Sequence, residues 1–271
     1  MRMNICNIII QRLLLHLVTI QGPFSLEPLA ITRTRHLVHV TQFFYRVLLT
    51  FLLDASVKLL DYFQDSCVFQ QESKGCGIHF MSKLQMAWVL NSWQICLNRM
   101  PELYEEVRVI TLPYELKGFF GFRNFVLETK DGERLAYANS IWTLVDMKKN
   151  LPTKIIPELD IYELDEKLDM DYCERKLAIP KEMKTLEEIP VTRHLIDTNG
   201  HVNNGRYVEL AMALIPADYE VNEVRAEYKM QARVGDIFVP KIAEEDDKIT
   251  VVMANQEDKV FATLQFLHQN K

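Results

Sequence analysis

The order of the predicted helices and strands constrains this fold more than any other feature of the sequence. An apolar stretch with helical spacing, residues 57–70, is followed by a run of segments with strand character. A second helical stretch, residues 203–215, is again followed by a run of strands. The chain therefore predicts two similar units in tandem, each with a helix that comes before an antiparallel sheet.

The predicted strands alternate between side chains that face a core and side chains that face away from it. In the first unit they cover residues 87–99, 106–114, 119–129 and 134–146, and Asp131-Gly132 between the last two is a strong hairpin signal. In the second unit they cover residues 191–196, 221–232, 237–243, 248–254 and 259–268. A helix packed on a curved antiparallel sheet is the layout of the hot-dog fold. We therefore predict an α+β chain of two hot-dog units that bury both helices under one continuous sheet.

Residues 146–190 interrupt this pattern. They are rich in Lys, Glu, Asp and Pro, with one short segment at 159–168 that has helical character. We predict four parts: an N-terminal extension (1–44), a first hot-dog unit (45–150), a linker (151–190) and a second unit (191–271). The first predicted unit begins with an almost purely apolar run at 45–53.

The composition is that of a globular protein, with 48% hydrophobic and 25% charged residues among 271. A net charge of −6 argues against nucleic acid as a partner and against a broadly anionic membrane surface. It leaves room for a local basic patch, which sequence alone cannot locate in three dimensions. A homodimer is an assembly that the sequence leaves open.

The cysteines and the N-terminal segment bear on the compartment. Five cysteines at scattered spacings include no ligand cluster, so we expect reduced thiols and neither a disulfide framework nor a metal site. Cys67 fits a small packed side chain better than a nucleophile. Residues 5–20 are apolar but too short and too interrupted to predict stable membrane insertion. We expect a cytoplasmic protein, with an organellar location as the alternative, because the arginine-rich residues 1–44 resemble a transit peptide.

One loop carries most of the chemical information in the sequence. A carboxylate, a carboxamide and an imidazole stand at alternate positions, Asp197, Asn199 and His201. If the backbone is extended there, all three side chains point the same way. The helix that follows exposes unpaired N–H groups near Asn203 and Asn204. A base, orienting groups and oxyanion donors together suit attack on an acyl carbonyl.

The same residues also fit a simpler interpretation. Asp, Asn and Gly cluster in ordinary turns, and Asn203 or Asn204 would then be only the cap of a helix. A single histidine in a loop is more often structural than catalytic.

Five stretches of the sequence resemble one known family, the acyl-acyl carrier protein thioesterases, especially its bacterial members. These stretches are LLDYFQD (59–65), AWVLNSWQ (87–94), KGFFGFRN (117–124), AYANSIW (136–142) and DTNGHVNN (197–204). The resemblance covers residues 54–268. It implies two tandem hot-dog units, hydrolysis of fatty acyl thioesters carried by acyl carrier protein, and no metal or organic cofactor.

The resemblance also implies a set of catalytic residues. Asp197, Asn199 and His201 match the family motif, and the family's further acidic residue falls at Gln231. Glutamine can orient a water but cannot accept a proton as a carboxylate does. Ala232 stands where plant relatives carry a cysteine, which argues against a cysteine nucleophile. We expect His201 to act on a water as general base, with direct attack by Asp197 as the alternative.

The resemblance further implies substrate contacts. In this family the first unit shapes the acyl tunnel, so Leu60, Phe63, Trp88 and Trp93 are candidates for its lining, although each also fits an ordinary core residue.

Basic residues are candidates for the carrier protein. Arg123, with Lys117 and Arg206, would meet the acidic carrier protein or its phosphopantetheine phosphate, and surface charge is the alternative for each.

Three other functions stay open at this point. Coenzyme A shares the pantetheine arm with the carrier protein, so an acyl-coenzyme A thioesterase fits the same residues. A hydratase or dehydratase of the same fold would also use His and Asp, although with a different spacing. Gln231 is the best argument for a binding protein without catalysis.

Overall fold

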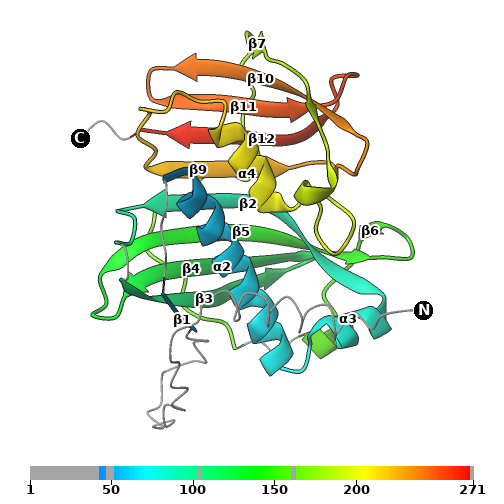
Figure 1. The fold of residues 1–271 in the computed structure, drawn as a ribbon. Coiled ribbons are helices and arrows are strands. Elements are labelled where there is room, and N and C mark those ends of the chain that lie inside the picture. The colour runs from blue at the N-terminus through cyan, green and yellow to red at the C-terminus, as the bar shows by residue number, and fades with distance from the viewer. Residues whose placement is uncertain (1–42, 47–51, 103–104, 160–162, 269–271) are drawn as a thin grey trace. The chain divides into compact units, whose positions relative to one another are not determined.

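The computed structural model describes residues 43–46, 52–102, 105–159 and 163–268. Its main feature is a 12-stranded sheet with the order β1-β3-β4-β5-β2-β9-β12-β11-β10-β7, with β6 beside β5 and β8 beside β10 (Figure 1). The strands are β1 (Phe43–Arg46), β2 (Met86–Leu97), β3 (Glu106–Lys117), β4 (Phe120–Thr129), β5 (Arg134–Asp146), β6 (Leu151–Pro152), β7 (Lys184–Thr185), β8 (Ile189–Pro190), β9 (Glu223–Tyr228), β10 (Ile237–Glu245), β11 (Lys248–Ala254) and β12 (Val260–Leu267).

The two predicted units join side by side through their strands. β2 of the first unit pairs antiparallel with β9 of the second, with Ser92 opposite Glu227 and Cys96 opposite Glu223. The ladder is therefore unbroken across the seam, as the sequence predicted for one continuous sheet.

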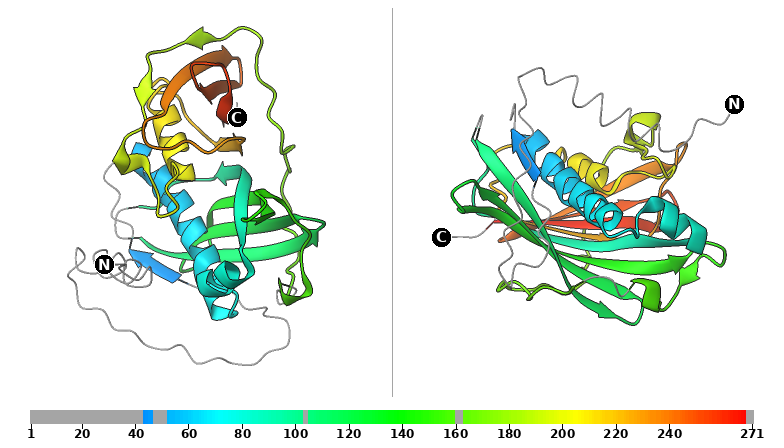
Figure 2. Two further views of the ribbon diagram at one scale, coloured as in Figure 1. Left: turned by 90° about the vertical axis from the view of Figure 1, so that its right-hand side faces the viewer. Right: turned by 90° about the horizontal axis from the view of Figure 1, so that it is seen from below.

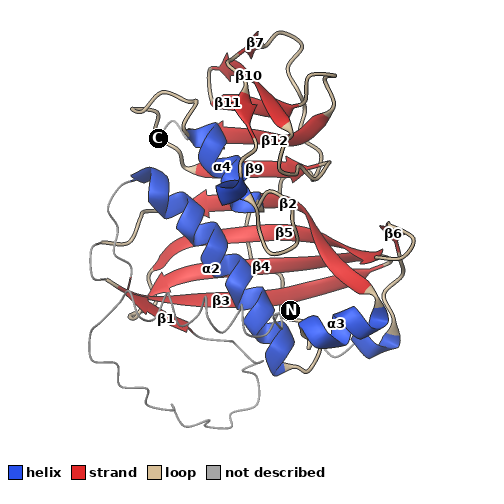
Figure 3. Cartoon of the chain, turned by 45° about the vertical axis from the view of Figure 1, so that its right-hand side comes forward, coloured by secondary structure: helices blue, strands red, loops and turns tan. Residues whose placement is uncertain are grey.

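Two helices cover one face of this sheet, which we call the inner face (Figure 2). They are α2 (Leu52–Ser73) and α4 (Asn204–Met212), and they contact each other above the seam. A short third helix, α3 (Ile78–Leu84), lies beyond the end of α2. Figure 3 shows all three helices on the same side of the strands.

An aromatic cluster fixes α2 to the sheet. The ring centroid of Phe63 on α2 lies 4.9 Å from that of Phe125 on β4, which lies 5.0 Å from that of Trp93 on β2. Leu60 and Phe63 have no exposed surface, and Trp93 is 1% exposed. Burying a side chain of this size contributes about 1.5–3 kcal/mol, so the helical spacing of apolar residues on α2 accounts for its position.

The linker crosses the opposite, outer face of the sheet, as the left view of Figure 2 shows. Buried polar side chains of the strands hold its backbone. Gln94 Nε2 donates to Asp171 O at 2.7 Å, and Gln94 Oε1 accepts from Cys173 N at 2.8 Å. Asn124 Oδ1 accepts from Leu168 N at 3.1 Å. These bonds explain why polar residues occupy the outer positions of strands that are buried on both faces.

The structure corrects two predictions of secondary structure. Residues 191–196 contain a 3₁₀ turn, Arg193–Leu195, instead of a strand. Three consecutive exposed residues, 192–194, separate the buried Val191 and Leu195, which does not fit the alternation of a strand. Residues 163–168 are irregular, and only Pro157–Leu159 makes a 3₁₀ turn at the start of the predicted helical segment. The helix α3 was not predicted.

The predicted N-terminal extension (1–44) lies outside the described residues except for its last two. Those two residues begin β1, which therefore starts before the apolar run at 45–53.

Candidate functional site

The loop between Asp197 and His201 is a tight hairpin rather than an extended segment. Asp197 N donates to His201 O at 2.8 Å, and Gly200 N donates to Asp197 O at 3.2 Å. Ile196 and Val202 form an antiparallel bridge at its base. Gly200 has φ +79°, a left-handed conformation that glycine adopts without steric cost. The turn corrects the expectation that the side chains alternate along an extended backbone.

The carboxylate of Asp197 organises this turn. Its Oδ1 accepts from the backbone N–H of Asn199 at 2.8 Å and from that of His201 at 3.3 Å. Its Oδ2 accepts from Asn199 Nδ2 at 3.3 Å. The structure thus brings Asp197 and Asn199 into contact. Among the described residues no hydrogen bond reaches the half-buried imidazole of His201, which leaves both of its ring nitrogens available to a substrate or a water.

The start of α4 follows directly from this loop. Asn203 is the N-cap, and its Oδ1 accepts from Gly205 N at 2.8 Å. Its own N–H donates to Leu195 O at 2.9 Å, which ties the helix start to the 3₁₀ turn. Asn203 therefore has the capping role that the sequence left open. The Asn204 carbonyl accepts from Tyr228 Oη at 2.9 Å, which fixes the first turn of α4 over β9.

The segment that contains Gln231 lies beside the loop. Val202 N donates to Ala232 O at 2.9 Å, and Ala232 N donates to Tyr207 Oη at 3.2 Å. Burial raises the pKa of Tyr207, so its hydroxyl stays protonated at neutral pH. Gln231 itself is exposed, and it follows β9, which ends at Tyr228 instead of at residue 232 as predicted. The backbone therefore places Gln231 next to the hairpin loop, as a loop residue.

Glu227 is a carboxylate that precedes Gln231 in the sequence, and its side chain points to the outer face of the sheet. It is 4% exposed, its Oε2 accepts from Leu177 N at 3.1 Å, and Lys229 Nζ lies 3.4 Å away. Since side chains alternate along β9, Glu227 faces the linker while Tyr228 faces α4. Glu227 is a linker anchor in this structure.

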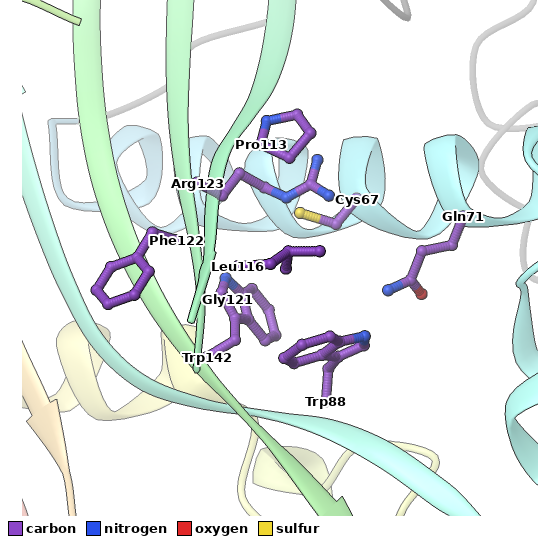
Figure 4. A pocket seen from close by; sticks show the side chains of 9 residues that line it. All are labelled: Cys67, Gln71, Trp88, Pro113, Leu116, Gly121, Phe122, Arg123 and Trp142. Carbon is purple, nitrogen blue, oxygen red and sulfur yellow. The ribbon is translucent and has the colours of Figure 1, made fainter. Parts of the chain in front are cut away.

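A pocket lies between α2 and the strands of the first unit (Figure 4). Its volume is about 410 Å³, including solvent at its mouth. The lining is mostly apolar and aromatic, with one guanidinium and one carboxamide: Cys67, Gln71, Trp88, Pro113, Leu116, Gly121, Phe122, Arg123 and Trp142. A concave apolar site with few polar groups is typical of ligand pockets.

The candidates for the acyl tunnel divide into two groups. Trp88 lines the pocket, where its ring packs on Gly121 so closely that a Cβ there would lie 3.1 Å from Trp88 Cζ3. Leu60, Phe63 and Trp93 belong to the aromatic core and do not line this pocket. Gly121 and Trp142 were not among the predicted lining residues, although both stand in stretches that carry the family resemblance.

The burial of Arg123 contradicts the alternative of a solvated surface charge, while its contact with the carrier protein or the phosphopantetheine phosphate stays a prediction. Arg123 is 8% exposed, and its Nη1 donates to Gln70 Oε1 on α2 and, at 2.7 Å, to Thr111 Oγ1 on β3. Arg123 thus ties α2 to the sheet at the pocket wall. Lys117 is exposed in the β3–β4 turn, and Arg206 pairs with Glu209 on α4.

Cys67 also lies at the pocket, but its chemistry is that of a packed side chain. Burial raises the pKa of its thiol above the ordinary value, which keeps it protonated and weakly nucleophilic.

Within the described ranges, no cluster of three or more His, Cys, Asp or Glu side chains has the arrangement of a metal site. None of the described helices is long and apolar enough to cross a membrane.

Comparisons with known families match both halves of the chain. The model of the acyl-ACP thioesterase N-terminal domain matches residues 55–162, and that of the C-terminal domain matches residues 179–269. A chloroplastic acyl-carrier-protein hydrolase, FATB1 of Cuphea viscosissima, is 22% identical over 66% of this chain and 47% of the relative. A chloroplastic palmitoyl-acyl carrier protein thioesterase of Cuphea hookeriana is 28% identical over 51% of this chain and 35% of the relative. The chain therefore spans less than half the length of these curated relatives.

Solved structures show the same fold. An acyl-ACP thioesterase from Bacteroides thetaiotaomicron superposes with a TM-score of 0.77 at 21% identity, over 85% of this chain and 98% of the other. A 12:0-ACP thioesterase from Umbellularia californica gives 0.70 at 16% identity, over 86% and 98%. This likeness confirms the predicted α+β hot-dog fold.

Proposed function

The chain belongs to the acyl-ACP thioesterase family, and we propose from this membership that it hydrolyses fatty acyl thioesters of acyl carrier protein. A water attacks the thioester carbonyl, the C–S bond breaks, and the products are a free fatty acid and the carrier-protein thiol. The observation that carries the proposal is the match of both family domains to a chain whose hairpin loop presents Asp, Asn and His.

We assign the activation of water to His201. Its imidazole takes a proton from the attacking water and returns it to the leaving thiolate. Asp197 fixes the turn on which His201 stands, because its Oδ1 accepts from His201 N and from Asn199 N. Asn199 positions the water or the thioester oxygen through its carboxamide. Attack by Asp197 itself, through an anhydride, is the alternative chemistry.

Two further contributions come from residues beside the loop. The first backbone N–H groups of α4, near Asn203 and Asn204, would stabilise the oxyanion, and removal of one such donor typically costs about 3–4 kcal/mol of barrier. Gln231 would orient the water by hydrogen bonding, since it cannot accept its proton.

The acyl chain would enter the pocket of the first unit, where Trp88 and Trp142 supply apolar surface. The thioester donor is proposed to be acyl carrier protein, with acyl-coenzyme A as the alternative that shares its pantetheine arm. A cytoplasmic location and a homodimer both stay predictions.

Thiol release from acyl-carrier-protein and acyl-coenzyme A substrates of several chain lengths tests the proposal. We expect His201→Ala to lower kcat by about 10²–10⁴-fold. His194→Ala is the matched control, because His194 is a second histidine, exposed in the neighbouring 3₁₀ turn. Its Nδ1 lies 2.8 Å from Thr192 Oγ1. Equal loss in both variants, or full activity in His201→Ala, would contradict the assigned role.

A second candidate function is acyl-thioester binding without hydrolysis, and the glutamine at position 231 favours it. This candidate predicts saturable binding of the acyl thioester with no thiol release by the wild-type protein. Isothermal titration on the preparations used for thiol release distinguishes the two functions.

A further inference from the structure

One end of the sheet carries exposed apolar and basic side chains together. The apolar ones are more exposed than the surrounding sheet residues: Phe119 at 38%, Met147 at 54% and Leu151 at 59%. Four exposed lysines accompany them: Lys117 at the end of β3, Lys148 and Lys149 in the turn after β5, and Lys154 after β6. We call these residues together the hairpin surface.

Backbone hydrogen bonds hold the two turns of the hairpin surface side by side. Leu144 N donates to Phe119 O at 2.8 Å, and Ile155 N donates to Gly118 O at 3.0 Å. Leu151 of β6 pairs with Asp146 of β5, so the turn between them projects from the sheet. Figures 1 and 3 show this hairpin extending beyond the end of the sheet. The surface is therefore contiguous and prominent.

The charge of the hairpin surface is opposite to that of the whole protein. Residues 147–157 include three lysines and no acidic residue, whereas the chain as a whole has a net charge of −6. Asp146 and Glu158 flank this range, and Asp146 accepts from Lys148 N at 2.9 Å and Lys149 N at 3.1 Å, while its Oδ2 lies 3.7 Å from Lys149 Nζ. Since charges more than about 8 Å apart are largely screened at physiological salt, a partner at this surface meets the lysines first.

A membrane interface fits this combination better than a folded protein does. The two most exposed apolar residues of the hairpin surface are Met147, in the turn between β5 and β6, and Leu151, in β6. They stand on a projection of the sheet. Apolar side chains on a projection can pass between lipid headgroups while lysines contact the phosphates. We propose that the hairpin surface binds membranes that contain anionic phospholipids. This interaction goes beyond the proposed hydrolysis and does not depend on it.

Co-sedimentation of the full chain with lipid vesicles tests this interaction. The probes are phosphatidylcholine vesicles with and without phosphatidylglycerol. The wild-type protein should sediment with the anionic vesicles, less so as salt increases, and stay in solution with the neutral ones. Each basic residue near an anionic surface contributes about 1 kcal/mol, which corresponds to a change in affinity of about fivefold. Lys148→Glu with Lys149→Glu should therefore weaken binding by at least about 25-fold.

A second pair of variants separates the apolar contribution from the charge. Met147→Asn with Leu151→Asn should weaken binding to the anionic vesicles while the lysines remain. The matched control is Met230→Asn with Val234→Asn in the second unit, at 37% and 54% exposure, and it should bind as the wild type does. Unchanged thermal unfolding and thiol release in each variant would show that the fold is intact.

Three results would overturn the proposal. One is a wild-type protein that stays in solution with anionic vesicles at low salt. Another is sedimentation that the lysine reversals leave unchanged. The third is lysine reversals that leave vesicle binding intact but weaken binding of acyl carrier protein, which would assign the hairpin surface to that acidic protein instead.

Discussion

The two units share a layout but use their helices differently. In the first unit α2 runs for 22 residues, and beyond its aromatic cluster it leaves an open pocket against the sheet. In the second unit α4 has 9 residues, and Tyr207 fills the space beneath it, with its ring centroid 5.4 Å from that of Phe238. The polar hairpin loop precedes α4. The difference teaches that two units of one fold can place an open apolar pocket in one half and a polar loop in the other.

The largest expected effect tests whether the two halves are one cooperative structure. Phe125→Ala in the first unit and Phe238→Ala in the second each remove a fully buried ring, which should cost about 3–5 kcal/mol of unfolding free energy. Because β2 and β9 share a ladder, we expect a single unfolding transition in both variants. Two transitions in calorimetry, with only one of them shifted, would show that the units are independent.

The next effect concerns the loop side of the comparison. Gln231→Glu restores a proton acceptor beside the hairpin loop and should raise kcat by about tenfold or more if the water needs such a base. The gain should be the same for every acyl chain length, because the pocket is unchanged. Gln256→Glu on the surface is the matched control. A gain restricted to one chain length would mean that Gln231 acts on acyl binding instead.

A substitution in the pocket of the first unit should lower activity, and by an amount that depends on the acyl chain length. In Gly121→Ala the new methyl group lies about 3.1 Å from Trp88 Cζ3, so the indole at the pocket wall has to shift. We expect kcat/KM for the longest accepted chain to fall by about tenfold, with a smaller change for short chains. A Trp88→Phe exchange in the same variant should restore the long chain. A uniform loss across chain lengths would argue that the pocket does not hold the chain.

The smallest effect concerns Asp165 of the linker, which neighbours the pocket wall. Burial raises the pKa of this carboxyl from 3.8 to about 6, with Arg123 acting against the rise. The protonated form is favoured in the folded state, so its stabilisation is present below pH 4 and is lost as the pH rises through 6. Asp165→Asn should therefore add about 1 kcal/mol of stability at pH 8, after allowance for solvent screening, and little at pH 4. Urea unfolding at both pH values measures this, and an equal gain at both would rule out titration.

The sequence predicts elements well where turns bound an apolar run. β5 and β11 begin and end at the predicted residues, because both are mostly apolar runs bounded by turns. It predicts the chemical groups of the hairpin loop but not its conformation. The Asp197 carboxylate captures two backbone N–H groups and closes the turn, and the spacing of two was compatible with either form.

Features that depend on contacts between residues distant in the sequence could not be predicted from local patterns. The route of the linker depends on acceptors such as Gln94, which reads in sequence only as one polar position in a strand. The burial of Arg123 depends on Gln70 and Thr111, which belong to two other elements. A charged residue has no sequence signal for its partners when they lie on different strands and helices.

The order of the strands has a consequence for how the protein behaves in a crowded solution. A sheet this wide would offer long rows of unpaired N–H and C=O groups if its outermost strands were long, and such rows recruit other chains. Of the described strands, the two at the ends are short, with four residues in β1 and two in β7. Lys184 in β7 adds charge at that border. At these borders the described sheet therefore offers few unpaired N–H and C=O groups, which disfavours the pairing of further chains with its edges.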